Sequence, residues 1–253
     1  MFSRAIVRAP STSIAQGLTS ANLGSVDYAR ACKQHQNYVD TLKQLGLEVI
    51  ELPAINTFAD AVFVEDVALV TPDFAVLTLP GAPTRQGEVE HMRPTIESIF
   101  DVVEYISAPG TLEAGDVMLA DKHFYIGLSD RTNQAGADQL IEIVSRYGYS
   151  GSVVDMSEML HLKTGVNFLD DNRYLVTGEF VDHPAFSEFD CIEVAQDEAY
   201  AANSLYINGT VLVPAGYTKT LKQIQALGYT TIEVDTSEFR KIDGGLSCLS
   251  LRF

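Results

Sequence analysis

The stretch Ser204-Leu-Tyr-Ile-Asn-Gly-Thr-Val-Leu-Val-Pro214 decides how the chain folds. Asn208-Gly209 stands between two apolar runs, and this dipeptide is the strongest short-range signal of a β-hairpin because both residues accept positive φ angles. A helix-like segment follows at Thr218–Leu227, and then a short strand at Thr231–Val234. The hairpin region Tyr200–Pro214 and these two segments together predict one ββαβ module.

Three earlier stretches repeat the pattern of a polar turn between two apolar runs. The hairpins are expected at Val62–Pro80, Leu112–Leu128 and Thr164–Val181, with turns at Thr71-Pro-Asp73, Asp121-Lys122 and Asp170-Asp-Asn172. The first two are followed by helix-like segments at Gly87–Phe100 and Gln134–Tyr147, and then by strands at Val102–Ile106 and Ser152–Met156. The third is expected to lack a proper helix, because Asp182–Asp190 is rich in Pro and Phe.

The two ends of the chain supply the parts of a fifth module in permuted order. The N-terminal part offers a strand at Ala5–Ala9, a helix at Asp27–Leu45 and a strand at Leu47–Leu52. A C-terminal strand at Leu246–Phe253 is expected to pair with the first strand and close the circle.

Five modules with a spacing of roughly 40 to 50 residues fall in the range of propeller repeats. The predicted fold is therefore α/β, a five-bladed ββαβ propeller with pseudo-five-fold symmetry. A doubly wound sheet is the alternative, but it predicts strands that alternate with helices and form no hairpins. No linker-like stretch divides residues 1–253, so a single propeller domain is expected.

The charge of the chain restricts its partners. With 34 acidic and 17 basic residues, the net charge is -17, which argues against a nucleic acid or an anionic membrane surface as partner. The same charge is compatible with a small cationic substrate.

The sequence shows no sign of membrane insertion or secretion. No apolar run approaches the roughly 18 residues of a membrane span. The first residues, Met1-Phe-Ser-Arg-Ala-Ile-Val-Arg8, lack the long apolar region of a signal peptide. Three cysteines, an odd number and far apart, do not form a disulfide framework, so a cytoplasmic protein is expected.

Charged residues interrupt three of the apolar segments. Glu65 and Asp66 lie in Phe-Val-Glu-Asp-Val-Ala, Glu113 and Asp116 lie in Leu-Glu-Ala-Gly-Asp-Val-Met, and His161 lies between two leucines. Each is expected inside or at the start of a strand. Burying an unpaired carboxylate is costly, so acids at equivalent points of successive modules indicate a shared cation.

Cys248 follows the pair Gly244-Gly245 and precedes the closing strand. A small buried side chain is the simpler interpretation, since unpaired cysteines are among the most buried residues. The other interpretation is a nucleophile. A thiolate, a histidine held by a carboxylate and several acids around one cation suit substitution at a guanidinium carbon through a covalent thiouronium.

Four motifs in order carry a resemblance over essentially the whole chain. They are Phe-Val-Glu-Asp at 63–66, Leu-Glu-Ala-Gly-Asp at 112–116, His-Leu-Lys-Thr at 161–164 and Asp-Gly-Gly-Leu-Ser-Cys at 243–248. This set resembles the bacterial type of the dimethylarginine dimethylaminohydrolase family, part of the guanidine-modifying superfamily. The resemblance implies a five-bladed propeller that works without metal or organic cofactor.

The resemblance also implies roles for individual residues. Cys248 would be the nucleophile, His161 the general acid and base, and Glu113 the carboxylate that orients His161. Substrate-binding roles would fall to seven further residues: Glu65 and Asp66 for the guanidinium, Asp60 and the carbonyl groups of Leu18 and Ile242 for the α-amino group, and Arg85 and Arg131 for the α-carboxylate. Arginine presents a fork that matches a carboxylate.

The remaining expectations concern a lid and a metal. Gln16–Gly24 matches the mobile lid of the family, and its small polar residues between glycines suit a loop that opens. Cys32 and His35 lie three apart on the predicted helix, but no second pair stands at ligand spacing, so no metal is expected.

The predicted activity is hydrolysis of asymmetric dimethylarginine and monomethylarginine to citrulline and methylamines. An arginine or agmatine deiminase on the same fold is the nearest alternative, because pocket volume decides between methylated and unmethylated arginine. A non-catalytic binding protein on the same propeller is the more distant one. The expected partner is a small cationic guanidino amino acid, with neither nucleic acid nor membrane, and a homodimer is left open.

Overall fold

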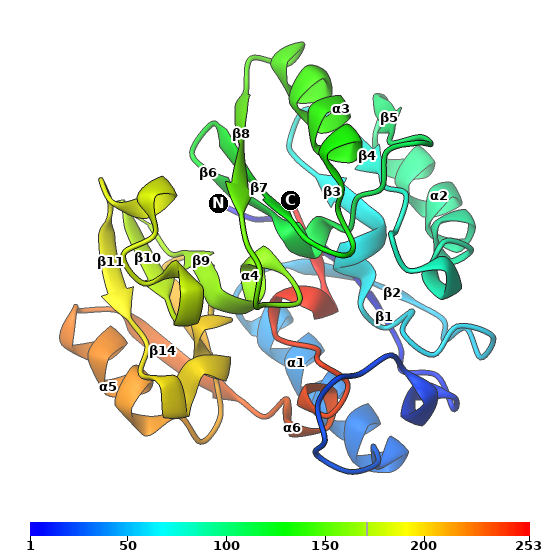
Figure 1. Cartoon of the computed structure of the whole chain (residues 1–253). Coiled ribbons are helices and arrows are strands. Elements are labelled where there is room, and N and C mark those ends of the chain that lie inside the picture. Colours follow the sequence, from blue (N-terminus) through cyan, green and yellow to red (C-terminus); the bar gives the residue numbers. More distant parts are fainter. Residues whose placement is uncertain (171) are drawn as a thin grey trace. The chain divides into compact units, whose positions relative to one another are not determined.

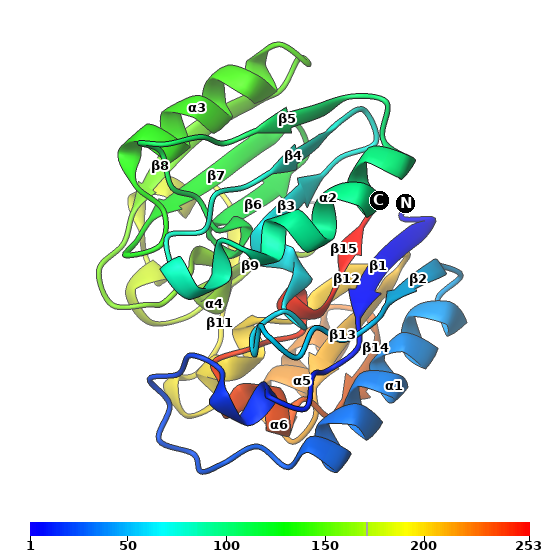
Figure 2. The same ribbon diagram turned by 90° about the vertical axis from the view of Figure 1, so that its right-hand side faces the viewer.

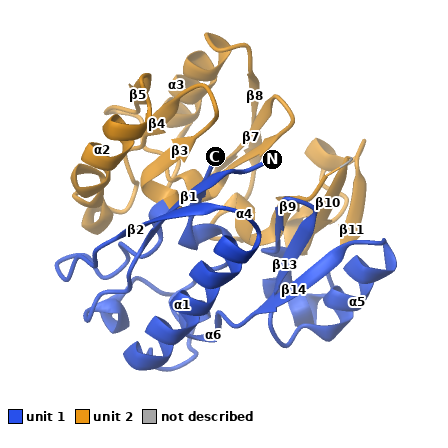
Figure 3. Cartoon of the chain, turned by 180° about the vertical axis from the view of Figure 1, so that it is seen from behind, with its two compact units in different colours: residues 1–64, 194–253 blue, residues 65–193 orange. Residues whose placement is uncertain are grey.

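The computed structural model describes residues 1–170 and 172–253, so Asp171 of the predicted turn at 170–172 lies outside the described residues. Figure 1 shows its helices and strands. The chain divides into two compact units, which Figure 3 colours separately: residues 1–64 with 194–253, and residues 65–193. The single-domain prediction stays a prediction.

The first unit contains two three-stranded sheets, in the orders β15-β1-β2 and β12-β13-β14. In each sheet the central strand is antiparallel to one neighbour and parallel to the other. Figure 2 shows β15, β1 and β2 side by side, with the two chain ends adjacent. The strands are β1 Arg4–Arg8, β2 Glu48–Leu52, β12 Leu205–Ile207, β13 Thr210–Pro214, β14 Thr230–Val234 and β15 Leu251–Arg252.

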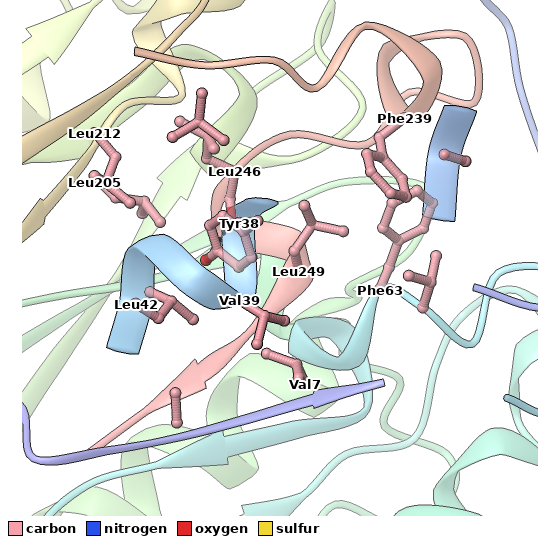
Figure 4. Packing of buried hydrophobic residues seen from close by; sticks show 14 of the residues in the cluster. Val7, Tyr38, Val39, Leu42, Phe63, Leu205, Leu212, Phe239, Leu246 and Leu249 are labelled. Carbon is pink, nitrogen blue, oxygen red and sulfur yellow. Dashed lines mark hydrogen bonds between the residues drawn. The ribbon is translucent and has the colours of Figure 1, made fainter. Parts of the chain in front are cut away.

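The α-helices described in this unit are α1 (Tyr28–Gln44), α5 (Thr218–Ala226) and α6 (Ser237–Arg240), of which α1 is the longest. It begins where the Asp27 carboxylate accepts the backbone N–H of Arg30, which satisfies an otherwise unpaired donor. Figure 4 shows Tyr38, Val39 and Leu42 of α1 packed in one apolar core with residues from the last turns of the chain. This core fixes the C-terminal segment against α1.

The second unit contains three three-stranded sheets of the same design, in the orders β3-β4-β5, β6-β7-β8 and β11-β10-β9. Helices α2 (Glu88–Ile99) and α3 (Gln134–Ser145) each precede the parallel third strand of their sheet. The strands are β3 Ala68–Val70, β4 Ala75–Leu77, β5 Val103–Tyr105, β6 Val117–Ala120, β7 His123–Leu128, β8 Ser150–Asp155, β9 Val166–Phe168, β10 Arg173–Val176 and β11 Asp190–Glu193.

The module prediction is confirmed at the level of the sheets. All four predicted hairpins form, and β1 pairs with the C-terminal strand. At the turn between β12 and β13, Asn208 and Gly209 adopt φ angles of 50° and 88°, as the Asn-Gly signal requires. Between β10 and β11 the structure has the 3-10 helices Gly178–Phe180 and Pro184–Phe186 in place of an α-helix.

Two predictions about local structure were wrong. The acids at 65 and 66 lie on the 3-10 helix Val64–Val67, and Glu113 directly precedes the 3-10 helix Ala114–Asp116. Consecutive residues of a strand point to opposite faces, whereas a 3-10 turn keeps neighbouring side chains within a third of a turn. Both Glu65 and Asp66 are therefore buried, at 4% and 2% exposure.

The C-terminal strand is also shorter than the predicted Leu246–Phe253, and Cys248 lies outside it. Ser247–Leu249 form a 3-10 helix, and only Leu251–Arg252 pair with β1. Side chains take up backbone groups that a strand would use: Asn203 accepts the N–H of Ser247, and Tyr38 donates to the carbonyl of Leu246. Among the described residues, no helix combines the length and the apolar character needed to cross a membrane.

Candidate functional site

The second unit holds a buried cluster built on Asp66, Glu113 and His161. One polar atom of each lies within 4.8 Å of the others, and all three side chains are buried. They come from the segments that precede β3, β6 and β9, which are the first strands of three successive sheets. The equivalence of positions that the sequence indicated for these acids and this histidine is therefore present in the structure.

Gly115 brings the three together. Its backbone N–H donates to Asp66 Oδ1 at 3.0 Å. A Cβ atom at this position would lie 2.6 Å from Asp66 Oδ1 and 2.8 Å from His161 Nδ1. Only a residue without a side chain lets the backbone approach both groups so closely.

His161 is held by a carboxylate. Its Nε2 lies 3.0 Å from Glu113 Oε2, while Glu113 Oε1 accepts the backbone N–H of Ala82 at 3.1 Å. Burial by itself lowers the pKa of His161, but the negative charges of Asp116 and Asp66 and the hydrogen bond with Glu113 outweigh it and raise the pKa to about 9. The imidazole is therefore protonated at neutral pH.

The positive charges of Arg85 and His161 lower the pKa values of the neighbouring carboxylates. Burial acts to raise the pKa of Asp66, but the charges of Arg85 and His161 outweigh burial and hold the pKa below its usual value. Glu113 shows the same balance, since the hydrogen bond with His161 and the nearby charges bring its pKa below its usual value despite burial. Both carboxylates are thus ionised beside a protonated imidazole.

Asp116 is a member of this site to which the sequence motifs gave no role. It is completely buried, and its Oδ1 accepts the N–H of Leu162 at 3.1 Å, next to His161. Ser129 and Thr132 each donate to its Oδ2 at 2.7 Å. Burial raises the pKa of Asp116 in spite of these donors. Asp116 fixes the backbone that carries His161, and its place in Leu-Glu-Ala-Gly-Asp was the signal available.

The two predicted arginines both reach the cluster. Arg85 Nη1 lies 2.5 Å from Asp66 Oδ2, and its Nη2 lies 2.8 Å from Glu88 Oε2, so Glu88 is a second residue that the motifs missed. Arg131 Nη1 lies 3.5 Å from Glu113 Oε1. The side chain of Arg85 is 5% exposed and that of Arg131 is 20% exposed, so Arg131 is the more accessible of the pair.

Glu65 forms an ion pair with Lys163. Lys163 Nζ is 2.7 Å from Glu65 Oε1, and both side chains are largely buried. Lys163 belongs to the short helix α4 (Leu162–Gly165) that follows His161. The motif His-Leu-Lys-Thr thus supplies two groups to the cluster, of which the sequence assigned only the histidine.

The first unit positions Cys248. The backbone N–H of Gly245 points at Cys248 Sγ from 3.4 Å. Asn203 makes two hydrogen bonds with Ser247, the residue before Cys248. Its Oδ1 accepts the N–H of Ser247 and its Nδ2 donates to Ser247 Oγ, both at 2.9 Å. The Tyr200 hydroxyl donates to the carbonyl of Gly244 at 2.8 Å. Hydrogen bonds from side chains therefore hold the bend both at Gly244 and at Ser247.

Three predicted residues for the substrate α-amino group also belong to the first unit. The N–H of Leu18 donates to Asp60 Oδ1 at 3.0 Å, and Asp60 is buried while Leu18 is 38% exposed. Ile242 is buried, and its Cδ1 would be 3.5 Å from a Cβ placed on Gly17. The same Cβ would be 2.8 Å from Asp60 Oδ1, so the absence of a side chain at Gly17 lets the backbone there lie close to the Asp60 carboxylate.

A metal is not needed to explain the cluster. In the ranges 1–170 and 172–253, the group of possible ligands that lies close enough is Asp66, Glu113 and His161. The carboxylates of Asp66 and Glu113 already accept hydrogen bonds from the backbone N–H groups of Gly115 and Ala82. The predicted absence of a metal stays a prediction.

Comparison with known proteins gives concordant results. The family model described as N,N dimethylarginine dimethylhydrolase, eukaryotic, matches residues 20–242. A curated relative from Pseudomonas aeruginosa, named N(G),N(G)-dimethylarginine dimethylaminohydrolase, is 50% identical over 254 residues, which cover 100% of both chains.

Two solved structures are similar over the entire chain. The enzyme of Pseudomonas aeruginosa, a cysteine-to-serine variant complexed with citrulline, has a TM-score of 0.99 at 49% identity, with 100% of both chains covered. A histidine-to-glycine variant of a dimethylarginine dimethylaminohydrolase, seen as an adduct with S-methyl-L-thiocitrulline, has a TM-score of 0.98 at 49% identity and the same coverage.

Proposed function

The chain belongs to the dimethylarginine dimethylaminohydrolase family, and from this premise we propose that it hydrolyses asymmetric dimethylarginine and monomethylarginine to citrulline and methylamines. The observation that carries the proposal is the buried pair of His161 and Glu113 beside Asp66. A protonated imidazole next to ionised carboxylates is suited to bind a guanidinium and to protonate a departing amine.

The proposed reaction begins at sulfur. The Cys248 thiolate attacks the guanidinium carbon and forms a C–S bond. The carbon–nitrogen bond to the methylated nitrogen then breaks, and the His161 imidazolium gives its proton to that nitrogen, which leaves as the amine. The product on the enzyme is a thiouronium on Cys248.

Water completes the reaction. Neutral His161 takes a proton from water as the oxygen attacks the thiouronium carbon. The C–S bond breaks, the thiolate of Cys248 is restored, and citrulline leaves. One water is consumed, its second proton passes through solvent to the departed amine, and the positive charge of the substrate therefore ends on the methylammonium. Glu113 orients His161 in both steps, and its ionised form stabilises the imidazolium.

Recognition of the two ends of the substrate is assigned to different residues. We propose that Asp66, with Glu65, binds the guanidinium and that Asp60 and the carbonyl groups of Leu18 and Ile242 bind the α-amino group. For the α-carboxylate we propose Arg131 and Arg85. Arg131 is the more exposed of the two, while Arg85 already donates to Asp66 and Glu88, which supports a larger share for Arg131.

The arrangement of the whole chain belongs to the same proposal. Five three-stranded sheets of one design support a five-bladed propeller with pseudo-five-fold symmetry, folded as a single catalytic domain. We keep the cytoplasm as the proposed compartment, on the number and spacing of the cysteines. A homodimer remains a prediction.

The proposal is tested by measuring citrulline released from asymmetric dimethylarginine, monomethylarginine, arginine and agmatine. We expect turnover of the two methylated substrates, and we expect Cys248→Ser to abolish it while leaving folding and ligand binding largely intact, since the hydroxyl is a much weaker nucleophile at neutral pH. Preference for arginine or agmatine with release of ammonia would instead assign the chain to the deiminases. No citrulline from any substrate would favour a binding protein.

A further inference from the structure

The loop at residues 17–25 lies between the 3-10 helix Ile14–Gln16 and helix α1, and it includes all of the predicted lid Gln16–Gly24 except Gln16, which ends the 3-10 helix. Its polar contacts with Asp60, Lys241 and Asp243 lie within the first unit. Its apolar side chains bury little surface, since Leu18 is 38% exposed and Leu23 is 47% exposed. A segment with so few buried apolar contacts has low local stability, so individual polar contacts decide whether it is closed.

Asp243 makes the shortest of these polar contacts. The backbone N–H of Ser20 donates to Asp243 Oδ2 at 2.6 Å, and Ser20 Oγ donates to the same oxygen at 3.2 Å. Hydrogen bonds to an ionised carboxylate are roughly twice as strong as those between neutral groups. This carboxylate therefore ties the middle of the loop to the segment that leads to Cys248.

Lys241 reinforces the same connection from two sides. Its backbone carbonyl accepts the hydroxyl of Thr19 at 3.0 Å. Its side-chain Nζ donates to the carbonyl of Ser25 at 3.1 Å, where the loop ends. Residues 241 and 243 thus hold the loop at three places, and Ile242 lies between them.

The backbone at Asp243 adopts a turn conformation that few residues take up easily. Its φ of 58° is in the left-handed region, which costs energy for most residues and least for glycine, with Asp and Asn next. Glycine would adopt this turn more easily. Asp243 therefore has two roles, to adopt the left-handed turn and to accept the hydrogen bonds from Ser20. Substitution by glycine keeps the first role and removes the second.

We propose that Asp243 is a positioning residue that latches the loop 17–25 onto the segment leading to Cys248. The latch holds the loop so that the carbonyl groups of Leu18 and Ile242 converge on a cationic amino group. Its kinetic consequence rests on the proposed function: loss of the latch raises KM for a methylated arginine and changes kcat little, because Asp243 touches neither Cys248 nor the His161 pair in the contacts described here.

Three variants isolate the carboxylate. Asp243→Gly keeps the left-handed backbone and removes the acceptor, and Asp243→Asn keeps the shape and one acceptor oxygen. Asp121→Gly is the matched control, because Asp121 also has a positive φ, of 54°, and lies in the turn between β6 and β7. The control removes the same negative charge from a left-handed turn outside the loop.

The first readout is amide hydrogen exchange of the peptide covering residues 17–25 in the free protein. We expect exchange about tenfold faster in Asp243→Gly than in the wild type and in Asp121→Gly, with Asp243→Asn between them. The second readout is steady-state kinetics with asymmetric dimethylarginine. We expect KM about tenfold higher in Asp243→Gly and kcat within about threefold of the wild type.

The outcomes separate the two proposals. Unchanged exchange in Asp243→Gly would overturn the latch, and faster exchange with unchanged KM would overturn its role in positioning. An equal effect in Asp121→Gly would overturn the assignment to this carboxylate. If the wild type turned over none of the substrates, the proposed function would fail, whereas hydrogen exchange would still decide whether the latch exists.

Discussion

A histidine buried among carboxylates has a different proton affinity from a histidine in water. His161 is paired with Glu113 and lies near Asp66 and Asp116, and their charges raise its pKa to about 9. A group whose pKa is raised on folding stabilises the folded state below its unfolded pKa, which for histidine is about 6.5. This contribution is fully present below that pH and is lost as pH rises through about 9.

The first prediction concerns this titration. In the wild type, the His161 imidazole should titrate near pH 9 when followed by NMR. Glu113→Gln removes one negative charge and should lower the pKa of His161, because the neutral amide stabilises the imidazolium less. The resonance of His123, which contacts Ser150 and Ser152 on another part of the unit, serves as the internal control and should not change. Titration of wild-type His161 near pH 6.5 would contradict this account.

At the scale of elements, the bend before Cys248 is the feature that positions the proposed nucleophile. Asn203 makes two reciprocal hydrogen bonds with Ser247, and all of these groups are buried. Asn203→Ala would leave a buried N–H and a buried hydroxyl without these partners, which costs about 1–3 kcal/mol. The turn would then hold sulfur less firmly.

The second prediction follows for this turn. Asn203→Ala should lower both the free energy of unfolding and the rate of turnover, with kcat/KM reduced about tenfold or more. Ser204→Ala is the control, since Ser204 is also buried but donates to the carbonyl of Ala201, away from Cys248. It should cost comparable stability and keep kcat/KM near that of the wild type. Equal losses of kcat/KM in both variants would indicate a general folding defect.

Elements also show what the sequence could predict. Hairpins were predictable because turns such as Asn208-Gly209 specify their own backbone angles between apolar runs. The 3-10 helix at Val64–Val67 was not, because a short apolar run with two acids has no periodicity that separates a turn from a strand. The long strand predicted at Leu246–Phe253 does not form over its whole length. The backbone of Leu246 and Ser247 is hydrogen-bonded to the side chains of Tyr38 and Asn203, which are distant in sequence, and no local pattern predicts such contacts.

The candidate site was predictable only in part. Glu113 and His161 were expected to pair, and the structure has them in contact. Asp116, Glu88 and Lys163 were given no role, although they contact residues next to the cluster, namely Leu162, Arg85 and Glu65. Their partners lie far away in sequence or on a different element, so motif spacing alone carries no information about them. The roles assigned to Cys248 and to the substrate-binding residues stay predictions.

At the scale of the whole molecule, the net charge of -17 is expected to affect the rate at which substrate is captured. Methylated arginines carry a net positive charge, so the field of the protein should attract them from a distance. Salt screens such attraction over about 10 Å at 0.1 M. The protein is therefore expected to bind its substrate less readily as salt is added.

The third prediction is that kcat/KM for asymmetric dimethylarginine falls severalfold between about 0.01 M and 0.2 M sodium chloride, while kcat changes little. Steady-state assays over a salt series measure both constants. Circular dichroism at each salt concentration serves as the control for folding. A kcat/KM that is constant or rises with salt would show that the acidic surface does not help to capture substrate.

The central claim is that Cys248 forms a covalent bond to the guanidinium carbon, and peptide mass spectrometry of acid-quenched turnover tests it most directly. The wild type mixed with excess asymmetric dimethylarginine should carry the thiouronium mass on the peptide that contains Cys248, and Cys248→Ser should carry none and release no citrulline. Citrulline release by Cys248→Ser, or an adduct on any other residue, would contradict the account.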